Sequence, residues 1–221
     1  RSPEPPASFG YTVDDQVAFV DALLAEAGVT EPVTVVVHDI GGMMGVPWVA
    51  RNLARVRGLM ITNTVAFEGF KWFGIARRWG DASFTGRLRS ALMMWAIGLR
   101  GGAPFKRAFG QQNPQLDPAE LDRITRTFAL NTAAKNASLR QFRELLRGDF
   151  FSGFDAMNEA ITAAVPTRVL WGDGDPYVAT QYAQRFARAK ATVLPGVGHW
   201  VPMVAADRLA DEIRALVGVP G

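Results

Sequence analysis

The fold of this chain is decided by the stretch Val33-Thr34-Val35-Val36-Val37-His38-Asp39-Ile40-Gly41-Gly42-Met43-Met44-Gly45. Its unbroken run of β-branched residues predicts a strand that is buried on both faces. The run stops at a carboxylate followed by two glycines, and small residues at such a turn let the next helix pack closely against the strand. The stretch therefore predicts a strand, a sharp turn and a helix, with Asp39 at the carboxyl end of the strand.

Asp39 has two interpretations at this position. As a side chain on a strand-turn-helix elbow, it would lie where open α/β sheets hold their ligands and where a helix N-terminus favours negative charge. As a helix N-cap, it would only satisfy backbone donors. The stretch alone favours neither interpretation. A base and its orienting acid farther along the chain would favour a nucleophile.

The composition is that of a globular protein of 221 residues, with 48% hydrophobic and 20% charged residues. One domain with an insertion is the default expectation for this length. The apolar stretch from Ala91 to Leu99 ends at Arg100, short of the roughly 18 apolar residues that a membrane-spanning helix needs. Because the chain has two histidines and no cysteine, we expect no disulfide, no metal site and no cofactor.

The charge and the opening residues suggest no partner beyond small molecules. The formal charge of +3 is spread along the chain and gives no nucleic-acid footprint. The opening segment Arg1-Ser2-Pro3-Glu4-Pro5-Pro6 lacks the pattern of a secretory signal. We expect a cytoplasmic protein that binds neither nucleic acid nor membrane.

Strand-like and helix-like segments alternate at both ends of the chain, which predicts an α/β fold with a mostly parallel sheet flanked by helices. The predicted strands are 33–37, 58–63, 167–171 and 191–194. The predicted helices begin after Thr12 and end at Gly28, span about 40–54, run from beyond Pro176 to about Ala189, and close the chain up to Val217.

Residues 65–165 have no strand-like run and predict an inserted helical cap. Its expected helices are 72–79, 85–99, 118–130 and 136–146. The core is then formed by residues 1–64 and 166–221. The first part of the insertion is rich in basic residues with few acids, for which a solvated basic face is favoured over a site for an anionic substrate or surface. These residues are Lys71, Arg77, Arg78, Arg87, Arg89, Arg100, Lys106 and Arg107.

Three polar residues are expected just past the ends of three strands, in the order Asp39, Asp175, His199. An order of nucleophile, acid and histidine belongs to the α/β-hydrolase fold. Three segments resemble the signatures of that superfamily, most of all its haloalkane dehalogenase and epoxide hydrolase branch, whose elbows often read His-Asp-x-Gly. They are Val37-His38-Asp39-Ile40-Gly41-Gly42, Leu170-Trp171-Gly172-Asp173-Gly174-Asp175-Pro176 and Gly196-Val197-Gly198-His199-Trp200.

The resemblance implies catalysis through a covalent aspartyl ester. Asp39 would displace a leaving group from an sp³ carbon, and His199, oriented by Asp175, would activate the water that hydrolyses the ester. The backbone N–H of Ile40 would hold the oxyanion. An esterase or lipase is disfavoured, because a carboxylate that attacks an ester carbonyl would form a mixed anhydride.

Two residues close in sequence to these three, Asp173 and His38, could also take part in the site. Asp175 is preferred to Asp173 as the acid, because the family's acid falls at the last position of Gly-x-x-Asp. A structural role beside the elbow is favoured for His38. The alternative for His199 is a surface loop histidine without a catalytic role, which its companions disfavour.

The leaving group is less well defined. A haloalkane dehalogenase-like hydrolase of small apolar substrates is our first choice, in part because Asn63-Thr64 is similar to that group. Yet dehalogenases generally place a Trp after the nucleophile, where this chain has Ile40. Trp72, Trp79 or Trp95 could line the pocket and supply a donor, although aromatics at helical spacing are more often core. Trp200 is assigned to the same pocket.

An epoxide hydrolase is the first alternative, although such enzymes usually activate the epoxide with cap tyrosines. The three tyrosines here, Tyr11, Tyr177 and Tyr182, lie outside the insertion. Fluoroacetate-type dehalogenases tend to place an Arg after the nucleophile, which is also absent. The remaining alternative, from a different class, is a catalytically silent binding protein or inactive fragment with this fold.

Proteins of this family have further strands ahead of the segment that corresponds to the start of this chain, including a His-Gly loop of the active site. We therefore expect the N-terminal half of the sheet to be absent and the strand 33–37 to form an apolar edge, which is prone to pairing. Either the chain is a truncated form of a longer protein, or a homo-oligomer or other partner covers this edge. Light scattering that finds a monodisperse monomer with this strand exposed would contradict the expectation.

Overall fold

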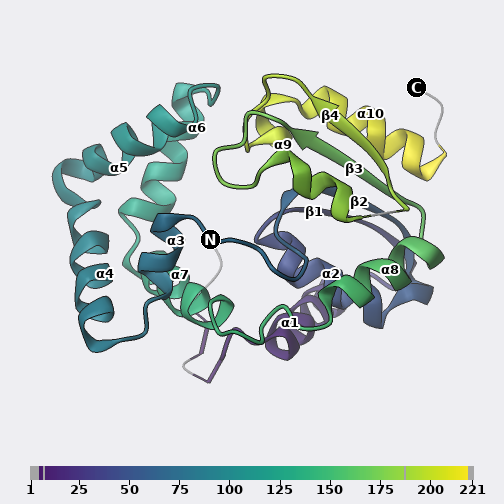
Figure 1. Cartoon of the computed structure of the whole chain (residues 1–221), viewed down its shortest axis with the longest axis horizontal. Helices are drawn as coiled ribbons and strands as arrows, with labels where there is room; N and C mark the ends of the chain where they lie inside the picture. The colour runs from purple at the N-terminus through teal and green to yellow at the C-terminus, as the bar shows by residue number, and fades with distance from the viewer. Residues whose placement is uncertain (1–4, 7, 187, 219–221) are drawn as a thin grey trace. The chain divides into compact units, whose positions relative to one another are not determined.

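The computed structural model describes residues 5–6, 8–186 and 188–218 of the chain. Most of the opening segment Arg1-Ser2-Pro3-Glu4-Pro5-Pro6 and residue 187 of the predicted helix that ends near Ala189 lie outside these ranges. The described residues form two compact units, a helical unit and a sheet unit (Figure 1). The helical unit contains Lys71–Phe150 and the described residues up to Thr12. The sheet unit contains Val13–Phe70 and the described residues from Phe151 onward.

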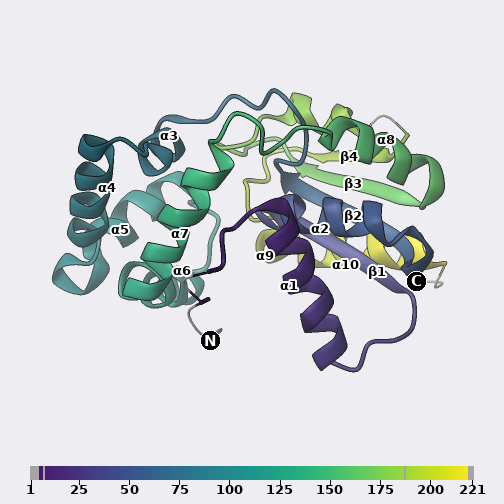
Figure 2. The same ribbon diagram turned by 90° about the horizontal axis from the view of Figure 1, so that it is seen from below.

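A parallel sheet forms the centre of the sheet unit. Within the described residues its strand order is β1-β2-β3-β4, with β1 at one end (Figure 2). The strands are β1 (Val33–Asp39), β2 (Val56–Thr64), β3 (Thr167–Gly172) and β4 (Lys190–Leu194). The predicted α/β fold with a parallel sheet is confirmed. Because adjacent strands run in one direction, their carboxyl ends meet at the same edge of the sheet, where such folds hold ligands.

Helices cover both faces of this sheet. α2 (Gly41–Arg51) packs against β1 and β2, and α1 (Val13–Glu26) and α8 (Phe154–Ala164) pack against α2. α9 (Val201–Val204) and α10 (Ala206–Val217) cover the opposite face. The core beneath α9 and α10 is made of buried apolar side chains, namely Met60, Leu170, Leu194, Val201 and Leu209. Two short 3₁₀ helices, η1 (Leu53–Arg55) and η3 (Thr180–Arg185), complete the unit.

The helical unit has no strand among its described residues, as predicted for the central part of the chain. Its helices are α3 (Gly74–Gly80), α4 (Phe84–Ala96), α5 (Leu99–Gln112), α6 (Pro118–Ile124), the π-helical turn η2 (Thr125–Ala129) and α7 (Thr132–Leu145). No helix among the described residues has the length and apolar character required to cross a membrane. The predicted boundaries of the insertion, 65–165, stay a prediction; α8 inside that range belongs to the sheet unit.

The helix predicted to run from beyond Pro176 to about Ala189 is wrong. Among the described residues of this range, only the 3₁₀ helix Thr180–Arg185 forms. The side chain of Asp175 accepts hydrogen bonds from the backbone N–H groups of Tyr177 and Val178, so the chain first makes a turn around this carboxylate. Backbone donors held by a side chain in this way favour a turn over a helix.

Two further helices were not predicted. α5 contains Gly101 and Gly102 in left-handed conformations and Pro104, all of which are helix-breaking signals in a sequence. α8 begins after Gly153, which also has a positive φ. Helical segments interrupted or preceded by such residues are recognised only when their packing is known.

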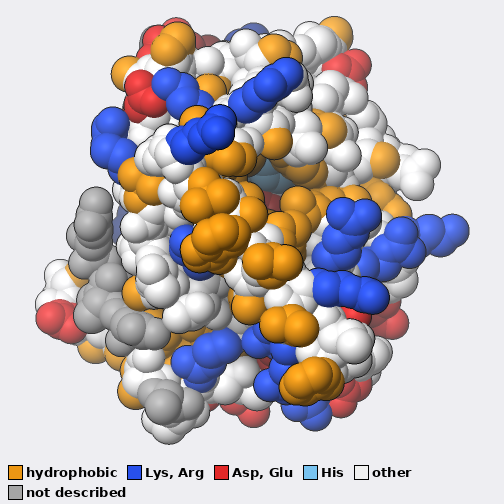
Figure 3. Space-filling view, turned by 90° about the vertical axis from the view of Figure 1, so that its left-hand side faces the viewer, with side chains coloured by type: hydrophobic (Ala, Val, Ile, Leu, Met, Phe, Trp, Pro, Cys, Tyr) orange, Lys and Arg blue, Asp and Glu red, His pale blue; other side chains and the backbone are white. Residues whose placement is uncertain are grey.

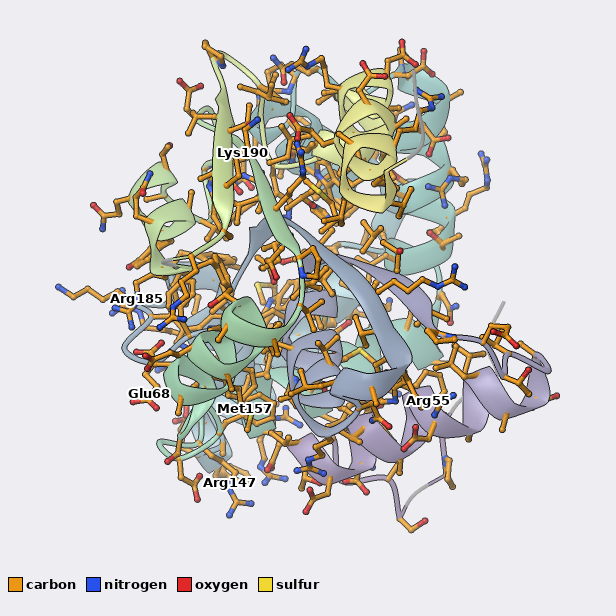
Figure 4. All side chains as sticks on the ribbon, turned by 90° about the vertical axis from the view of Figure 1, so that its right-hand side faces the viewer. Arg55, Glu68, Arg147, Met157, Arg185 and Lys190 are labelled. Atoms are coloured by element: carbon orange, nitrogen blue, oxygen red, sulfur yellow. The ribbon has the colours of Figure 1, made fainter. Side chains whose placement is uncertain are left out.

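The segment that leaves the sheet unit before Lys71 and the segment that re-enters it after Phe150 are joined by hydrogen bonds and an ion pair. Glu68 Oε1 accepts a hydrogen bond of 2.7 Å from the backbone N–H of Gly153, and the backbone N–H of Glu68 donates to Asp155 Oδ1 at 3.2 Å. Arg185 forms an ion pair with Asp155 and donates to the carbonyl of Glu68. Glu68 and Arg185 lie near one another in Figure 4. These contacts join the two crossing segments within the sheet unit.

β1 has only one neighbouring strand among the described residues, β2. Val35 and Val37 face α2, because Gly45 of α2 lies against both side chains. Val36 points to the opposite face and is 43% exposed. This exposure is what an apolar edge strand would show, while the oligomer or partner expected to cover it stays a prediction.

Close packing of α2 on the sheet depends on its glycines. A Cβ added at Gly42 would overlap the hydroxyl group of Thr64, whereas a Cβ added at Gly41 would meet no atom within 4 Å. We therefore predict that Gly42→Ala lowers the free energy of unfolding by about 1–3 kcal/mol, as overpacking in a core does.

The matched control is Gly41→Ala, which should change this free energy by no more than about 1 kcal/mol, the range of helix propensity between Gly and Ala. Urea unfolding of both variants measures the difference. Equal stabilities of the two variants would contradict the close contact between α2 and β2.

Candidate active site

Asp39 lies at a strained turn between β1 and α2. It is the last residue of β1, and its φ of 48° is in the left-handed region that non-glycine residues rarely adopt. The Thr64 hydroxyl donates to the Asp39 carbonyl and helps to hold this conformation. α2 begins at Gly41 with Ile40 as its N-cap residue. The strand-turn-helix elbow predicted from the sequence is therefore present, and Asp39 is not the N-cap residue of the helix.

The carboxylate of Asp175 is buried and receives hydrogen bonds at both oxygens. Its side chain has 0% exposed surface. Oδ1 accepts from the backbone N–H groups of Tyr177 at 2.7 Å and Val178 at 3.0 Å. Oδ2 accepts from Asn63 Nδ2 at 2.8 Å and from His199 Nδ1 at 2.7 Å. This set of donors fixes Asp175 as the partner of the histidine ring.

His199 lies between the two carboxylates. Its side chain is 3% exposed, with Nδ1 bound to Asp175 and Nε2 3.7 Å from Asp39 Oδ1. The structure thus brings Asp39 together with Asp175 and His199, which lie more than 130 positions farther along the sequence. One ring nitrogen is held by an acid and the other faces the second carboxylate, which is the geometry of an oriented base beside a nucleophile.

The loop that carries His199 packs tightly on the end of β3. A Cβ at Gly172 would overlap the backbone carbonyls of Val197 and Gly198, so only glycine allows this approach. Gly174 N donates to Val197 O at 2.9 Å, and Gly196 N donates to Asp173 Oδ1 at 2.6 Å. Asp173 therefore holds the loop, while Asp175 holds the ring.

The two carboxylates control the ionisation of His199. Burial lowers the pKa of the His199 ring, but the hydrogen bond and charge of Asp175 and Asp39 outweigh it and raise this pKa from 6.5 to about 9. His199 is therefore protonated at pH 7 while Asp39 is ionised. For Asp39, burial raises the pKa, but the interaction with His199 holds it below 3.8, although 41% of the Asp39 side chain stays open to solvent.

His38 supports the backbone of His199. Its Nε2 donates to the carbonyl of His199 at 2.9 Å, and its ring lies 4.7 Å from the His199 ring and 5.5 Å from the Trp200 ring between centroids. Burial, followed by the charge of His199, lowers the pKa of His38 below 6.5. A neutral ring with its proton on Nε2 satisfies this contact, which supports the structural role predicted for His38.

Asn63 is a further residue of the site; the sequence showed its similarity to dehalogenases but assigned it no role in holding the acid. It is fully buried at the end of β2 with a φ of 25°. Its side-chain oxygen accepts a hydrogen bond from the backbone N–H of Gly172 at 2.9 Å. Its side-chain nitrogen donates to the carbonyl of Gly172 at 3.1 Å and to the carboxylate of Asp175. Asn63 thereby joins β2, β3 and the acid. The signal was an amide at the end of an otherwise apolar strand, since a buried amide requires partners.

The tryptophans predicted to line a pocket occupy different surroundings. Trp200 lies beside His199, with ring centroids 5.3 Å apart. Trp72 and Trp79 pack against Phe142 inside the helical unit. Trp95 is 61% exposed, which does not favour a role in lining a pocket.

The part of the chain that the structure describes contains no group of three or more His, Asp or Glu side chains arranged to hold a metal ion. The charged groups at the site are instead paired with one another. The arrangement can supply a carboxylate nucleophile, a histidine that moves a proton, and an acid that orients it.

The chain belongs to the alpha/beta hydrolase family, whose sequence model matches residues 1–212. This agrees with the strand order and the elbow. Family membership defines the fold and the general type of site, but substrates differ widely among proteins that share a fold.

A stretch of 66 residues is 42% identical to the cis-3-alkyl-4-alkyloxetan-2-one decarboxylase of Xanthomonas campestris pv. campestris. The match covers 30% of this chain and 22% of that relative, so it spans about a fifth of the relative's length.

Solved structures with similar folds have lower sequence identity. An epoxide hydrolase, CorEH, superimposes with a TM-score of 0.70 at 16% identity, covering 99% of this chain and 77% of that one. A thermophilic esterase from Thermogutta terrifontis superimposes with a TM-score of 0.66 at 16% identity, covering 97% of this chain and 74% of that one. These likenesses support the α/β-hydrolase fold.

Proposed function

We propose that this protein is a hydrolase that attacks an electrophilic sp³ carbon with Asp39 and forms a covalent aspartyl ester. The observation that carries the proposal is the position of the buried His199 ring, with Nδ1 on Asp175 at 2.7 Å and Nε2 facing Asp39 at 3.7 Å. A histidine held in this way can serve a carboxylate nucleophile as the base of a second step.

In the first step, an oxygen of Asp39 forms a bond to the substrate carbon, and the bond from this carbon to the leaving group breaks. The leaving group departs with the electron pair. The pKa of Asp39 below 3.8 keeps the carboxylate ionised at neutral pH. Its 41% exposed side chain leaves surface at which a substrate can approach.

In the second step, His199 takes a proton from water, and the water oxygen attacks the carboxyl carbon of the ester. The N–H of Ile40, whose interaction with the Asp39 carboxylate helps to lower the pKa of this carboxyl group, would stabilise the tetrahedral oxyanion. The tetrahedral intermediate then collapses and expels the substrate alkoxide, which takes the proton from His199 and leaves as an alcohol. The remaining acid proton passes to solvent and regenerates the Asp39 carboxylate.

The charge on Asp39 couples the two steps. The ionised carboxylate is one of the groups that raise the pKa of His199 to about 9. Once Asp39 becomes a neutral ester this contribution disappears, so the pKa of His199 falls and the ring becomes available as a base. Ester formation therefore prepares the base for hydrolysis.

Haloalkane dehalogenase-like hydrolysis remains our first choice, with an epoxide as the alternative substrate. A halide leaves as an anion and needs no proton, whereas an epoxide oxygen needs a proton donor. The aromatic rings beside His199, namely His38, Tyr177 and Trp200, lie in the sheet unit. The tyrosines expected in the cap of an epoxide hydrolase are absent from 65–165.

A dialkyl oxetan-2-one is a second candidate substrate, favoured by the 42% identity to a protein named for this activity. Attack by Asp39 on ring carbon 4 would break its bond to the ring oxygen and release a carboxylate on the neighbouring carbon. Loss of CO₂ from this carboxylate would supply the electron pair of a new C=C bond and expel Asp39. This route needs Asp39 but consumes no water.

The test is to trap the ester in His199→Gln, which retains Asp39 but lacks the base. We predict that incubation with 1-haloalkanes, epoxides and 3,4-dialkyl oxetan-2-ones yields an alkyl adduct on Asp39 with at least one class, seen by peptide mass spectrometry. Release of halide, diol or CO₂ by the unaltered protein then identifies which of the three reactions it catalyses.

The control is the double variant Asp39→Asn/His199→Gln, which should form no adduct. An adduct on another residue would contradict the assignment of the nucleophile. If the single variant gains no mass and the unaltered protein turns over no member of the panel, the alternative of a silent binding protein is favoured.

A further inference from the structure

α4 of the helical unit carries an exposed apolar stripe. Four of its large side chains remain open to solvent: Phe84 at 84%, Leu88 at 64%, Leu92 at 60% and Trp95 at 61%. Their spacing of four, four and three residues places them on one face of the helix. Isolated exposed apolar residues are common, but a row along a whole helix marks an interaction surface.

The orientation of α4 is fixed by its other face. Gly86, Ser90 and Met94 are buried there. Arg143 of α7 donates to Ser90 Oγ at 3.3 Å, and Lys135 of α7 donates to the Met94 carbonyl at 2.9 Å. Because these contacts hold the helix from within the unit, the apolar stripe faces outward as part of the folded structure.

Basic residues border the stripe on both sides. On a helical projection, Arg87 lies on one side of the four apolar side chains and Arg89 on the other, and both are exposed. Residues 71–112 contain eight Lys and Arg residues but one acid, Asp81. Figure 3, which views the side of the molecule that carries α4, shows apolar side chains with Lys and Arg side chains around them.

We propose that α4 docks on the surface of an anionic lipid bilayer. A helix with an apolar face bordered by Lys or Arg lies in the interface, its apolar side chains among the lipids and its cations near the headgroups. Trp95, with an apolar ring and a polar N–H, suits this interfacial region. The proposal does not rest on the chemistry proposed for Asp39.

Charge favours a lipid surface over a second copy of the chain. Two α4 stripes packed face to face would bring the arginine borders of one copy against those of the other, and like charges in such a contact are unfavourable. An anionic surface instead complements both borders together. The proposal differs from the expectation from the sequence that the protein binds no membrane, and the experiment below decides between them.

The experiment is flotation of the whole chain with vesicles. We predict binding to vesicles of equal parts phosphatidylglycerol and phosphatidylcholine, and weak binding to phosphatidylcholine alone. Leu88→Glu/Leu92→Glu and Arg87→Glu/Arg89→Glu should each weaken binding to the anionic vesicles by about tenfold or more, since each removes apolar or cationic contacts. High salt should weaken binding by the unaltered chain.

The matched control is Leu23→Glu on α1, which changes an exposed leucine (56%) on a helix with acidic residues in its first turn. It should bind as the unaltered chain does. Circular dichroism melts show whether each variant is folded. The proposal is overturned if binding is equal for both vesicle types, if the folded α4 variants bind normally, or if they change self-association in light scattering while vesicle binding is unaffected.

Discussion

The site depends on the interactions of the His199 ring with two carboxylates, that of Asp175 at Nδ1 and that of Asp39 at Nε2. A histidine with 3% exposed surface would lose its proton readily if burial acted alone. Two carboxylates reverse this tendency and raise its pKa to about 9. The charge of the ring consequently depends on the charge of its partners. Any reaction that neutralises Asp39 also changes the proton affinity of His199.

The sheet positions these three side chains. Asp39 follows β1 directly, while Asp175 and His199 lie in the loops after β3 and β4. Because parallel strands present their carboxyl ends at one edge, residues far apart in sequence meet there. Asn63 at the end of β2 binds both β3 and Asp175, so each of the four strands contributes to the site.

Small residues permit the close approach of these segments. Gly172 lets the loop that carries His199 lie against the end of β3, and Gly42 lets α2 approach Thr64, whose hydroxyl holds the carbonyl of Asp39. The strained conformation of Asp39, with a φ of 48°, is stabilised by these surroundings. Precise positions of the polar groups thus follow from packing at glycines.

The sequence was sufficient to predict the parallel sheet and to identify Asp39, Asp175 and His199 as companions. Buried strands give strong apolar runs, and turns rich in glycine mark where they end. Asn63 was assigned no role because a single amide at a strand end has no characteristic spacing. α5 was missed because Gly101, Gly102 and Pro104 predict a break in the helix. The break is real, since Arg100, Gly101 and Gly102 have non-helical conformations, but helical structure continues beyond it to Gln112.

The apolar stripe on α4 illustrates a further limit of prediction from sequence, namely which face of a helix is buried. Its apolar residues have helical spacing, which usually indicates a core face, whereas Trp95 was assigned to a pocket because its side chain could supply a hydrogen-bond donor there. In the folded unit, α7 instead contacts the face with Ser90 and Met94. Which face of a helix is buried depends on its neighbours, and helical periodicity does not specify them.

The most direct measurement of the central claim, that the charge of Asp39 sets the protonation of His199, is a pH titration of the histidine rings by NMR. With only two histidines in the chain, His38 serves as an internal reference that should titrate below 6.5. We predict that His199 titrates at about 9, and that Asp39→Asn lowers this pKa toward 6.5, because removing the negative charge favours the neutral ring. A His199 pKa near 6.5 in the unaltered protein, or an unchanged pKa in Asp39→Asn, would contradict the account.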